Sequence, residues 1–163
     1  LVLDRAATTQ QAVDLLLSYD MFATSGRDYH FYITDAQGDG RVIEYDCDSP
    51  ERMPVVTPTR QVTNFFVMHE NKVAPFQKNG AYGHGRERYD AISAVLDESP
   101  AGTDAQVTAW KALRTASQAP NPEDVTSNTQ WSIVFDNESL TADVALRRRW
   151  DDVHHADIHG NMV

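Results

Sequence analysis

The sequence has little of three features that would narrow its chemistry: cysteine, long apolar runs and positive charge. Cys47 is the only cysteine among 163 residues, so no disulfide can form within the chain. It stands between Asp46 and Asp48, and neighbouring carboxylates disfavour the thiolate that attacks a substrate. Cys47 is therefore a poor candidate nucleophile.

No apolar run approaches the length of a membrane span. Residues 1–5 lack the basic start and the long apolar core of a signal peptide. The first residue is Leu1 rather than Met, so we expect the sequence to be a piece of a longer protein. We expect neither a membrane nor a targeting segment in this piece.

Positive charge is scarce, with 14 basic against 24 acidic residues and a formal net charge of −10. No basic stripe offsets this charge, which argues against nucleic acid and anionic membranes as partners. The one basic run, residues 147–149, precedes Asp151 and Asp152 and predicts a solvated strand end. No Gly-rich phosphate loop, G-x-S-x-G elbow or CxxC pair is present, so no cofactor is expected.

Hydrophobic periodicity predicts helices and strands in an order typical of the α+β class. The helices are expected at residues 9–19, 86–97 and 104–116, and the strands at 29–35, 41–46, 61–67 and in a hairpin over 131–146. Thr8 with Gln11, and Thr103 with Gln106, predict capping boxes. Residues 68–84 are expected to form a loop, and the chain from Asp151 onward to fray. The expected fold is one domain, residues 1–163, with a largely antiparallel sheet and layered helices.

The run from residue 28 to 45 predicts a hairpin, because apolar and polar residues alternate on both sides of a turn with Gly38 and Gly40. Residues 35–40 resemble the start of an EF-hand, with Asp46 at the twelfth position. An EF-hand loop lies between two helices and has glutamate at its twelfth position, whereas here the flanking segments are predicted strands and the twelfth residue is an aspartate. A simple turn is therefore favoured. His154, His155 and His159 lack a partner at ligand spacing, so no metal site is expected there.

Asn64 is the first candidate for chemistry, because asparagine is disfavoured in strands and costly to bury unsatisfied. It stands between Val62 and two phenylalanines. Its amide could donate to a developing oxyanion, as acyl transfer requires. The alternative is an asparagine at a strand end that bonds its own backbone in a turn.

Arg86 and Arg88 are the second candidates, at the start of a predicted helix where the dipole favours anions rather than cations. Such a pair could bind a carboxylate or support a charged intermediate. The alternative is a solvated helix start.

Taken together, the hairpin, the segment Val62-Thr63-Asn64 and the pair Arg88-Tyr89 resemble the linear amide C–N hydrolases, the choloylglycine hydrolase and penicillin V acylase family of N-terminal-nucleophile hydrolases. The resemblance covers most of the chain and corresponds to the C-terminal half of the family pattern. It implies an αββα sandwich, and it assigns Asn64 to the oxyanion site and Arg88 to the active site, with Arg86 as the alternative in a register shifted by two residues.

The resemblance further implies a substrate-facing loop that contains Met21 and Phe22, although these residues could equally pack in the core. The family nucleophile is an N-terminal cysteine whose own amine serves as base. It would precede this sequence, so the chain alone is expected to be inactive on its small-molecule amide substrate. A homo-oligomer is expected, because the missing half would leave apolar strand faces uncovered. The rival interpretation is a non-catalytic interaction or regulatory module.

Overall fold

The computed structural model describes residues 2–20, 29–124, 127–157 and 159. Met21 and Phe22 lie outside the described residues. The chain divides into two compact units, Leu1–Glu87 and Arg88–Val163, and each is described by itself below. Every strand pairing in the described residues is antiparallel, which confirms the α+β class, but the strands form two three-stranded sheets rather than one. The assignment of the chain to a single domain stays a prediction.

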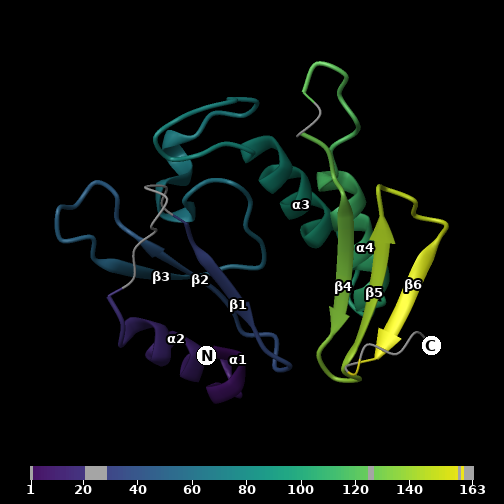
Figure 1. Cartoon of the computed structure of the whole chain (residues 1–163), viewed down its shortest axis with the longest axis horizontal. Coiled ribbons are helices and arrows are strands. Elements are labelled where there is room, and N and C mark those ends of the chain that lie inside the picture. The colour runs from purple at the N-terminus through teal and green to yellow at the C-terminus, as the bar shows by residue number, and fades with distance from the viewer. Residues whose placement is uncertain (1, 21–28, 125–126, 158, 160–163) are drawn as a thin grey trace. The chain divides into compact units, whose positions relative to one another are not determined.

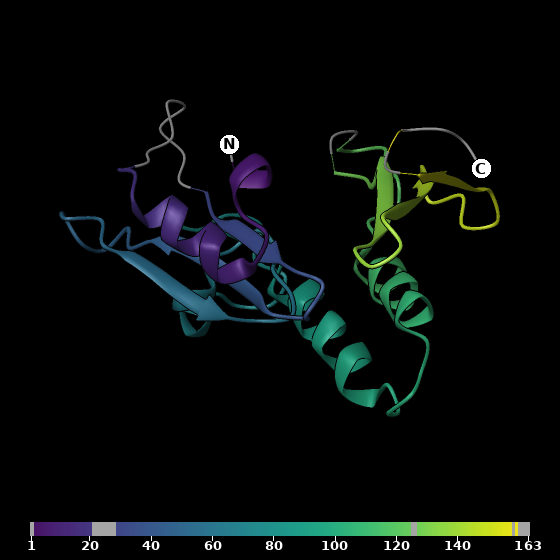
Figure 2. The same ribbon diagram turned by 90° about the horizontal axis from the view of Figure 1, so that it is seen from below.

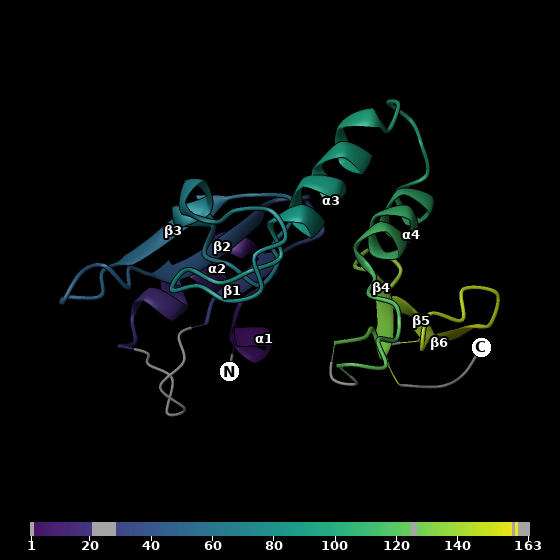
Figure 3. The same cartoon turned by 90° about the horizontal axis from the view of Figure 1, so that it is seen from above.

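The first unit contains a sheet in the order β1-β2-β3 (Figure 1). Its elements are α1 (Val2–Arg5), α2 (Thr9–Leu17), β1 (Phe31–Thr34), β2 (Gly40–Tyr45), β3 (Pro54–Pro58) and the 3-10 helix η1 (Val67–Lys72). In the central strand β2, four consecutive residues from Val42 to Tyr45 are buried, because both faces are covered. Ile43 packs against Val13 and Leu16 of α2, while η1 lies on the opposite face (Figure 3).

The predicted hairpin is confirmed, with Phe31 opposite Ile43 and Thr34 opposite Gly40. Its turn is a tight one, in which Gly38 has a φ of 80° and its N–H donates to the Asp35 carbonyl. The Asp35 carboxylate accepts from the backbone N–H groups of Thr9 at 2.8 Å and Gln37 at 3.0 Å. The Thr9 hydroxyl in turn donates to the Asp39 carbonyl at 2.7 Å. The turn is therefore fixed to the first residue of α2.

We expect Asp35 to make the stability of the first unit depend on pH. The hydrogen bond from Thr9 N–H is the main cause that lowers the pKa of Asp35. The folded chain therefore binds a proton at Asp35 less strongly than the unfolded chain does. The ionised carboxylate stabilises the fold above about pH 4, and this stabilisation is lost as the pH falls through the pKa that Asp35 has in the folded chain. The melting temperature of the native chain should exceed that of Asp35→Asn most at neutral pH, and the gap should close on acidification. A gap that stays constant, or one matched by Asp151→Asn in the second unit, would contradict this expectation.

The third strand was expected at residues 61–67, and that expectation is wrong. The strand that pairs with β2 is β3, with Val56 opposite Ile43. Its β-branched run Val55-Val56-Thr57 favours a strand, and its two flanking prolines are tolerated because β3 is an edge strand. Residues 61–66 are irregular apart from an isolated bridge between Phe65 and Gly83, and η1 occupies the start of the expected 68–84 loop.

The second unit contains two helices and a sheet in the order β4-β5-β6. Its elements are α3 (Arg86–Glu98), whose first two residues belong to the first unit, α4 (Ala105–Ala116), β4 (Trp131–Asp136), β5 (Thr141–Leu146) and β6 (Val153–Asp157). The predicted helices and the 131–146 hairpin are confirmed, and α4 packs against β4 (Figure 2). None of the helices in the described ranges has the length and apolar composition that a membrane crossing requires.

Two details of this unit differ from expectation. Asp104 rather than Thr103 caps α4, because its carboxylate accepts from the N–H groups of Gln106 and Val107. The chain after Asp151 does not fray at once, since β6 pairs with β5. A cross-strand hydrogen bond of 2.5 Å between His155 Nδ1 and Asp143 supports that pairing.

Candidate functional site

A cavity of about 780 Å³ lies in the first unit and contains the predicted Asn64. Three segments of the chain line the cavity. They are residues 29–30, residues 63–66 and residues 79–84, of which Tyr82 alone does not line it. The polar residues among them are His30, Thr63, Asn64, Asn79 and His84, and the aromatic ones are Tyr29, Phe65 and Phe66. The wall is about half polar and half apolar, so the cavity is a candidate site for a small molecule that carries polar groups.

The backbone around Asn64 is held on both sides. His84 N–H donates to the Asn64 carbonyl at 2.9 Å, Phe66 N–H donates to the Tyr82 carbonyl at 3.0 Å, and the Thr63 hydroxyl donates to the Gly85 carbonyl at 3.0 Å. The two segments approach so closely that a Cβ on Gly83 would lie 2.1 Å from the Asn64 carbonyl oxygen, and Gly83 has a φ of 102°. Asn64 lies in a bend and is exposed, so the expectation of a buried strand amide is wrong. Its backbone is nonetheless fixed, as a preorganised donor requires.

A buried carboxylate lies behind one wall of the cavity. Glu44 is 0% exposed, and its two oxygens accept from the backbone N–H groups of Val67 at 2.7 Å and Met68 at 2.8 Å. The oxygen bonded to Val67 also lies 3.2 Å from Nδ1 of His30, a residue of the cavity wall. Glu44 thus caps η1 and orients His30 at the same time.

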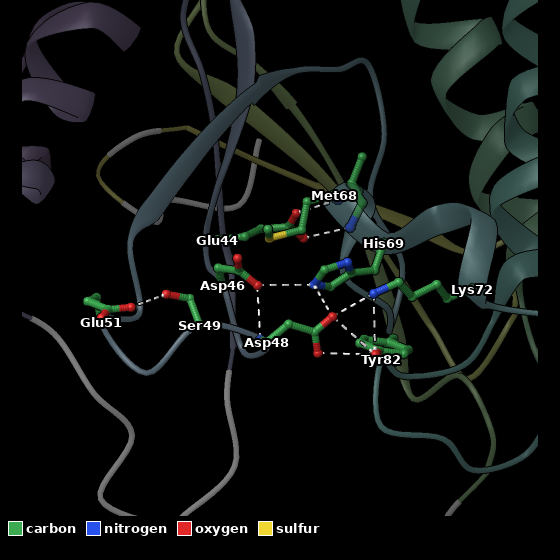
Figure 4. A network of polar contacts seen from close by, with 10 residues as sticks. Glu44, Asp46, Asp48, Ser49, Glu51, Met68, His69, Lys72 and Tyr82 are labelled. Carbon is green, nitrogen blue, oxygen red and sulfur yellow. Dashed lines mark hydrogen bonds and ion pairs between the residues drawn. The ribbon is translucent and has the colours of Figure 1, made fainter.

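A second polar network adjoins the cavity and is centred on the turn between β2 and β3 (Figure 4). Tyr82 lies between the cavity residues Ala81 and Gly83, and its hydroxyl donates to Asp48 at 3.1 Å. The Lys72 ammonium donates to the other oxygen of Asp48 at 2.5 Å, which lowers the pKa of Asp48 and raises that of Lys72. The network therefore fixes one wall of the cavity to the turn.

The predicted arginines have different surroundings. Arg86 donates to the Glu70 carbonyl at 2.7 Å, which gives it a structural role at the end of η1. Arg88 is half-buried in the first turn of α3. Asn64 belongs to the first unit and Arg88 to the second, so a shared site for the two stays a prediction. Residues 35–40 connect the strands β1 and β2, as the turn interpretation expected, and Asp35 accepts from backbone N–H groups of its own turn and of α2.

The remaining candidates are not among the residues that line the cavity. His155 pairs with Asp143 in the second unit, and within the described ranges neither it nor His154 or His159 joins a group of three potential metal ligands. Cys47 is half-buried in the turn after β2 and is not among the residues that line the cavity.

No protein-family model matches the chain, and no curated protein matches it. The family resemblance and the function it implies stay predictions.

Sequence reasoning missed His30, Glu44 and His69. Glu44 could have been predicted from the sequence, because it lies within the apolar run Val42-Ile43-Glu44-Tyr45. A carboxylate in a strand that is buried on both faces requires hydrogen-bond partners. The pairing with His30 follows from the hairpin register, in which Phe31 faces Ile43 and the next residues on each strand are His30 and Glu44. His69 had no such signal, because its burial depends on how η1 packs.

Proposed function

We propose that this chain is the C-terminal portion of an amidase that hydrolyses linear amide C–N bonds, in substrates such as conjugated bile salts or penicillin V. The observation that supports it best is the position of Asn64, a residue that lines the cavity and whose backbone is held by hydrogen bonds on both sides. An amide donor carried on a fixed backbone at a cavity wall suits a developing oxyanion.

The proposed reaction proceeds in two steps. A thiolate attacks the amide carbonyl carbon, the carbonyl oxygen gains negative charge and accepts from the Asn64 amide, and the amine leaves after protonation of its nitrogen. Water then hydrolyses the thioester and regenerates the thiol. Arg88 would support the charged intermediate, and Met21 with Phe22 would line the acyl pocket. The nucleophile would be an N-terminal cysteine supplied by residues that precede this sequence.

We further propose that the two sheets belong to an αββα sandwich. In each unit a helix covers one face of a sheet, α2 in the first and α4 in the second. Trp131 and Phe135 in β4 are 63% and 68% exposed to solvent. They lie on the same face of the strand because they are four residues apart. An apolar face of this kind favours cover by another sheet or by a second copy of the chain, in line with the expected homo-oligomer.

The chain as given is expected to hydrolyse neither conjugated bile salts nor penicillin V. An oxyanion donor can stabilise charge but cannot form the covalent intermediate, and Cys47 lies beside two aspartates. Product release is measured with the purified chain before and after thiol alkylation. Hydrolysis that is abolished by alkylation of Cys47 would contradict this expectation.

The amidase proposal itself is tested on the protein expressed together with the residues that precede Leu1 in its reading frame. Amide hydrolysis that is lost when the processed N-terminal cysteine is replaced by alanine supports it. The absence of such a cysteine, together with the absence of hydrolysis, would favour the non-catalytic interaction module instead.

A further inference from the structure

We propose that the β2–β3 turn and η1 form a binding site for a thiophilic divalent cation of the Zn²⁺ type, with Cys47 Sγ, His69 Nε2 and an Asp48 carboxylate oxygen as ligands. This inference is independent of the amidase proposal and uses residues outside the cavity wall. One potential ligand atom from each of the three residues lies within 4.8 Å of the other two. Around bound zinc such atoms lie about 3.5 Å apart, so the site needs a contraction of roughly 1 Å.

His69 supplies the observation that points to a ligand. It is 8% exposed and lies at a kink in η1, with a φ of −115° and a ψ of 23°. Its Nε2 is buried, and no hydrogen bond to it is formed within the described part of the chain. A buried polar atom without a hydrogen bond is rare and calls for an explanation such as an ion.

The His69 nitrogen is directed at the turn (Figure 4). Nε2 lies 3.4 Å from Asp46 Oδ1 and 3.9 Å from Asp48 Oδ2, contacts that become ion pairs when His69 is protonated. Asp46 lies close to the His69 nitrogen but is not part of the group of three, so the proposed site has three protein ligands and its fourth position is left to solvent. A mixed set of thiolate, imidazole and carboxylate ligands suits zinc better than calcium or magnesium, which prefer oxygen alone.

The aspartates that disfavour a free thiolate at Cys47 favour a bound cation. As the metal–sulfur bond forms, the Cys47 thiol loses its proton to solvent, and the cation offsets the added negative charge. Lys72 is the internal competitor, because its ammonium lies 2.5 Å from Asp48 Oδ2 and its side chain is 41% exposed. The metal would displace this flexible cation from Asp48.

The probe is Co²⁺, whose bond to a thiolate gives a charge-transfer absorption band that imidazole and carboxylate ligands do not give. Titration of the chain with Co²⁺ should produce this band at one metal per chain, and Zn²⁺ but not Mg²⁺ should remove it. Cys47→Ala should abolish the band, and His69→Asn should weaken Co²⁺ binding about tenfold or more. The control is His155→Asn in the second unit, which should leave binding unchanged.

The variant Lys72→Met distinguishes two interpretations of the residues around Asp48, namely a metal-binding site and a network that only stabilises the fold. Loss of the competing ammonium should tighten Co²⁺ binding by up to about fivefold, the scale of an exposed ion pair. A structural network instead predicts a lower melting temperature with no effect on metal binding. Absence of the band in the native chain, a band that survives Cys47→Ala, or unchanged affinity in both His69→Asn and Lys72→Met would overturn the proposal.

Discussion

In the full-length protein, Asn64→Ala is expected to lower kcat by roughly 10²–10³-fold, the usual loss for one oxyanion donor. KM should change little, because the hydrogen bond strengthens mainly as charge develops in the transition state. The hydrogen bonds that position Asn64 use its backbone and those of Phe66 and His84, so they remain in the variant. Steady-state kinetics and the melting temperature are measured on the same preparation.

The matched control is Asn79→Ala, which removes a second asparagine from the wall of the same cavity. A smaller effect on kcat for Asn79→Ala assigns the loss to the position of Asn64 and not to the polarity of the cavity. If Asn64→Ala lowers the melting temperature and leaves kcat per folded molecule unchanged, Asn64 has a structural role in the bend and is not an oxyanion donor.

Glu44→Ala is expected to destabilise the first unit by about 3–5 kcal/mol, because it leaves buried partners without an acceptor. The affected groups are the N–H groups of Val67 and Met68 and the His30 ring. Equilibrium urea unfolding is followed by far-ultraviolet circular dichroism. All three tryptophans, Trp110, Trp131 and Trp150, lie in the second unit, so their fluorescence reports that unit separately.

Glu51→Ala is the control for Glu44→Ala. Glu51 is exposed in the turn before β3, and its carboxylate accepts from the Ser49 hydroxyl and from a backbone N–H of its own turn. Its loss should change stability by no more than about 0.5 kcal/mol. Glu44→Gln keeps one acceptor oxygen and should fall between the two variants. Equal stabilities for Glu44→Ala and Glu51→Ala would contradict the role assigned to the buried carboxylate.

Local sequence signals predicted most of the elements but not how they combine. The helices around Val13, Val95 and Trp110 have clear helical periodicity, and both hairpins alternate with a period of two, so these elements are found where expected. The strand β3 was missed because Pro54 and Pro58 are strand breakers everywhere except at an edge, and edge position is a property of the whole sheet. β6 was missed for a similar reason, since its polar residues are stabilised by pairing with β5.

In the candidate site, too, the local feature could be predicted from the sequence and the tertiary arrangement could not. Asn64 was singled out because an asparagine within an apolar run is unusual, and this can be recognised from the local sequence alone. The cavity around it depends on the approach of residues 79–84, a segment with little periodicity that is joined to residues 63–66 by long-range hydrogen bonds. Contacts of this kind between irregular segments leave no pattern in the sequence that periodicity could detect.

The prolines of β3 also determine at which edge the first sheet can pair with a further strand. Thr59 N–H and the Met53 carbonyl bond toward β2, so by alternation Pro54, Val56 and Pro58 direct their backbone nitrogens away from it. Two of these three positions carry no hydrogen to donate, and the outer edge is a poor template for another strand. Any strand added to this sheet, from the rest of the protein or from a second copy, should therefore join beside β1. The prolines would also protect the β3 edge against edge-to-edge aggregation during folding.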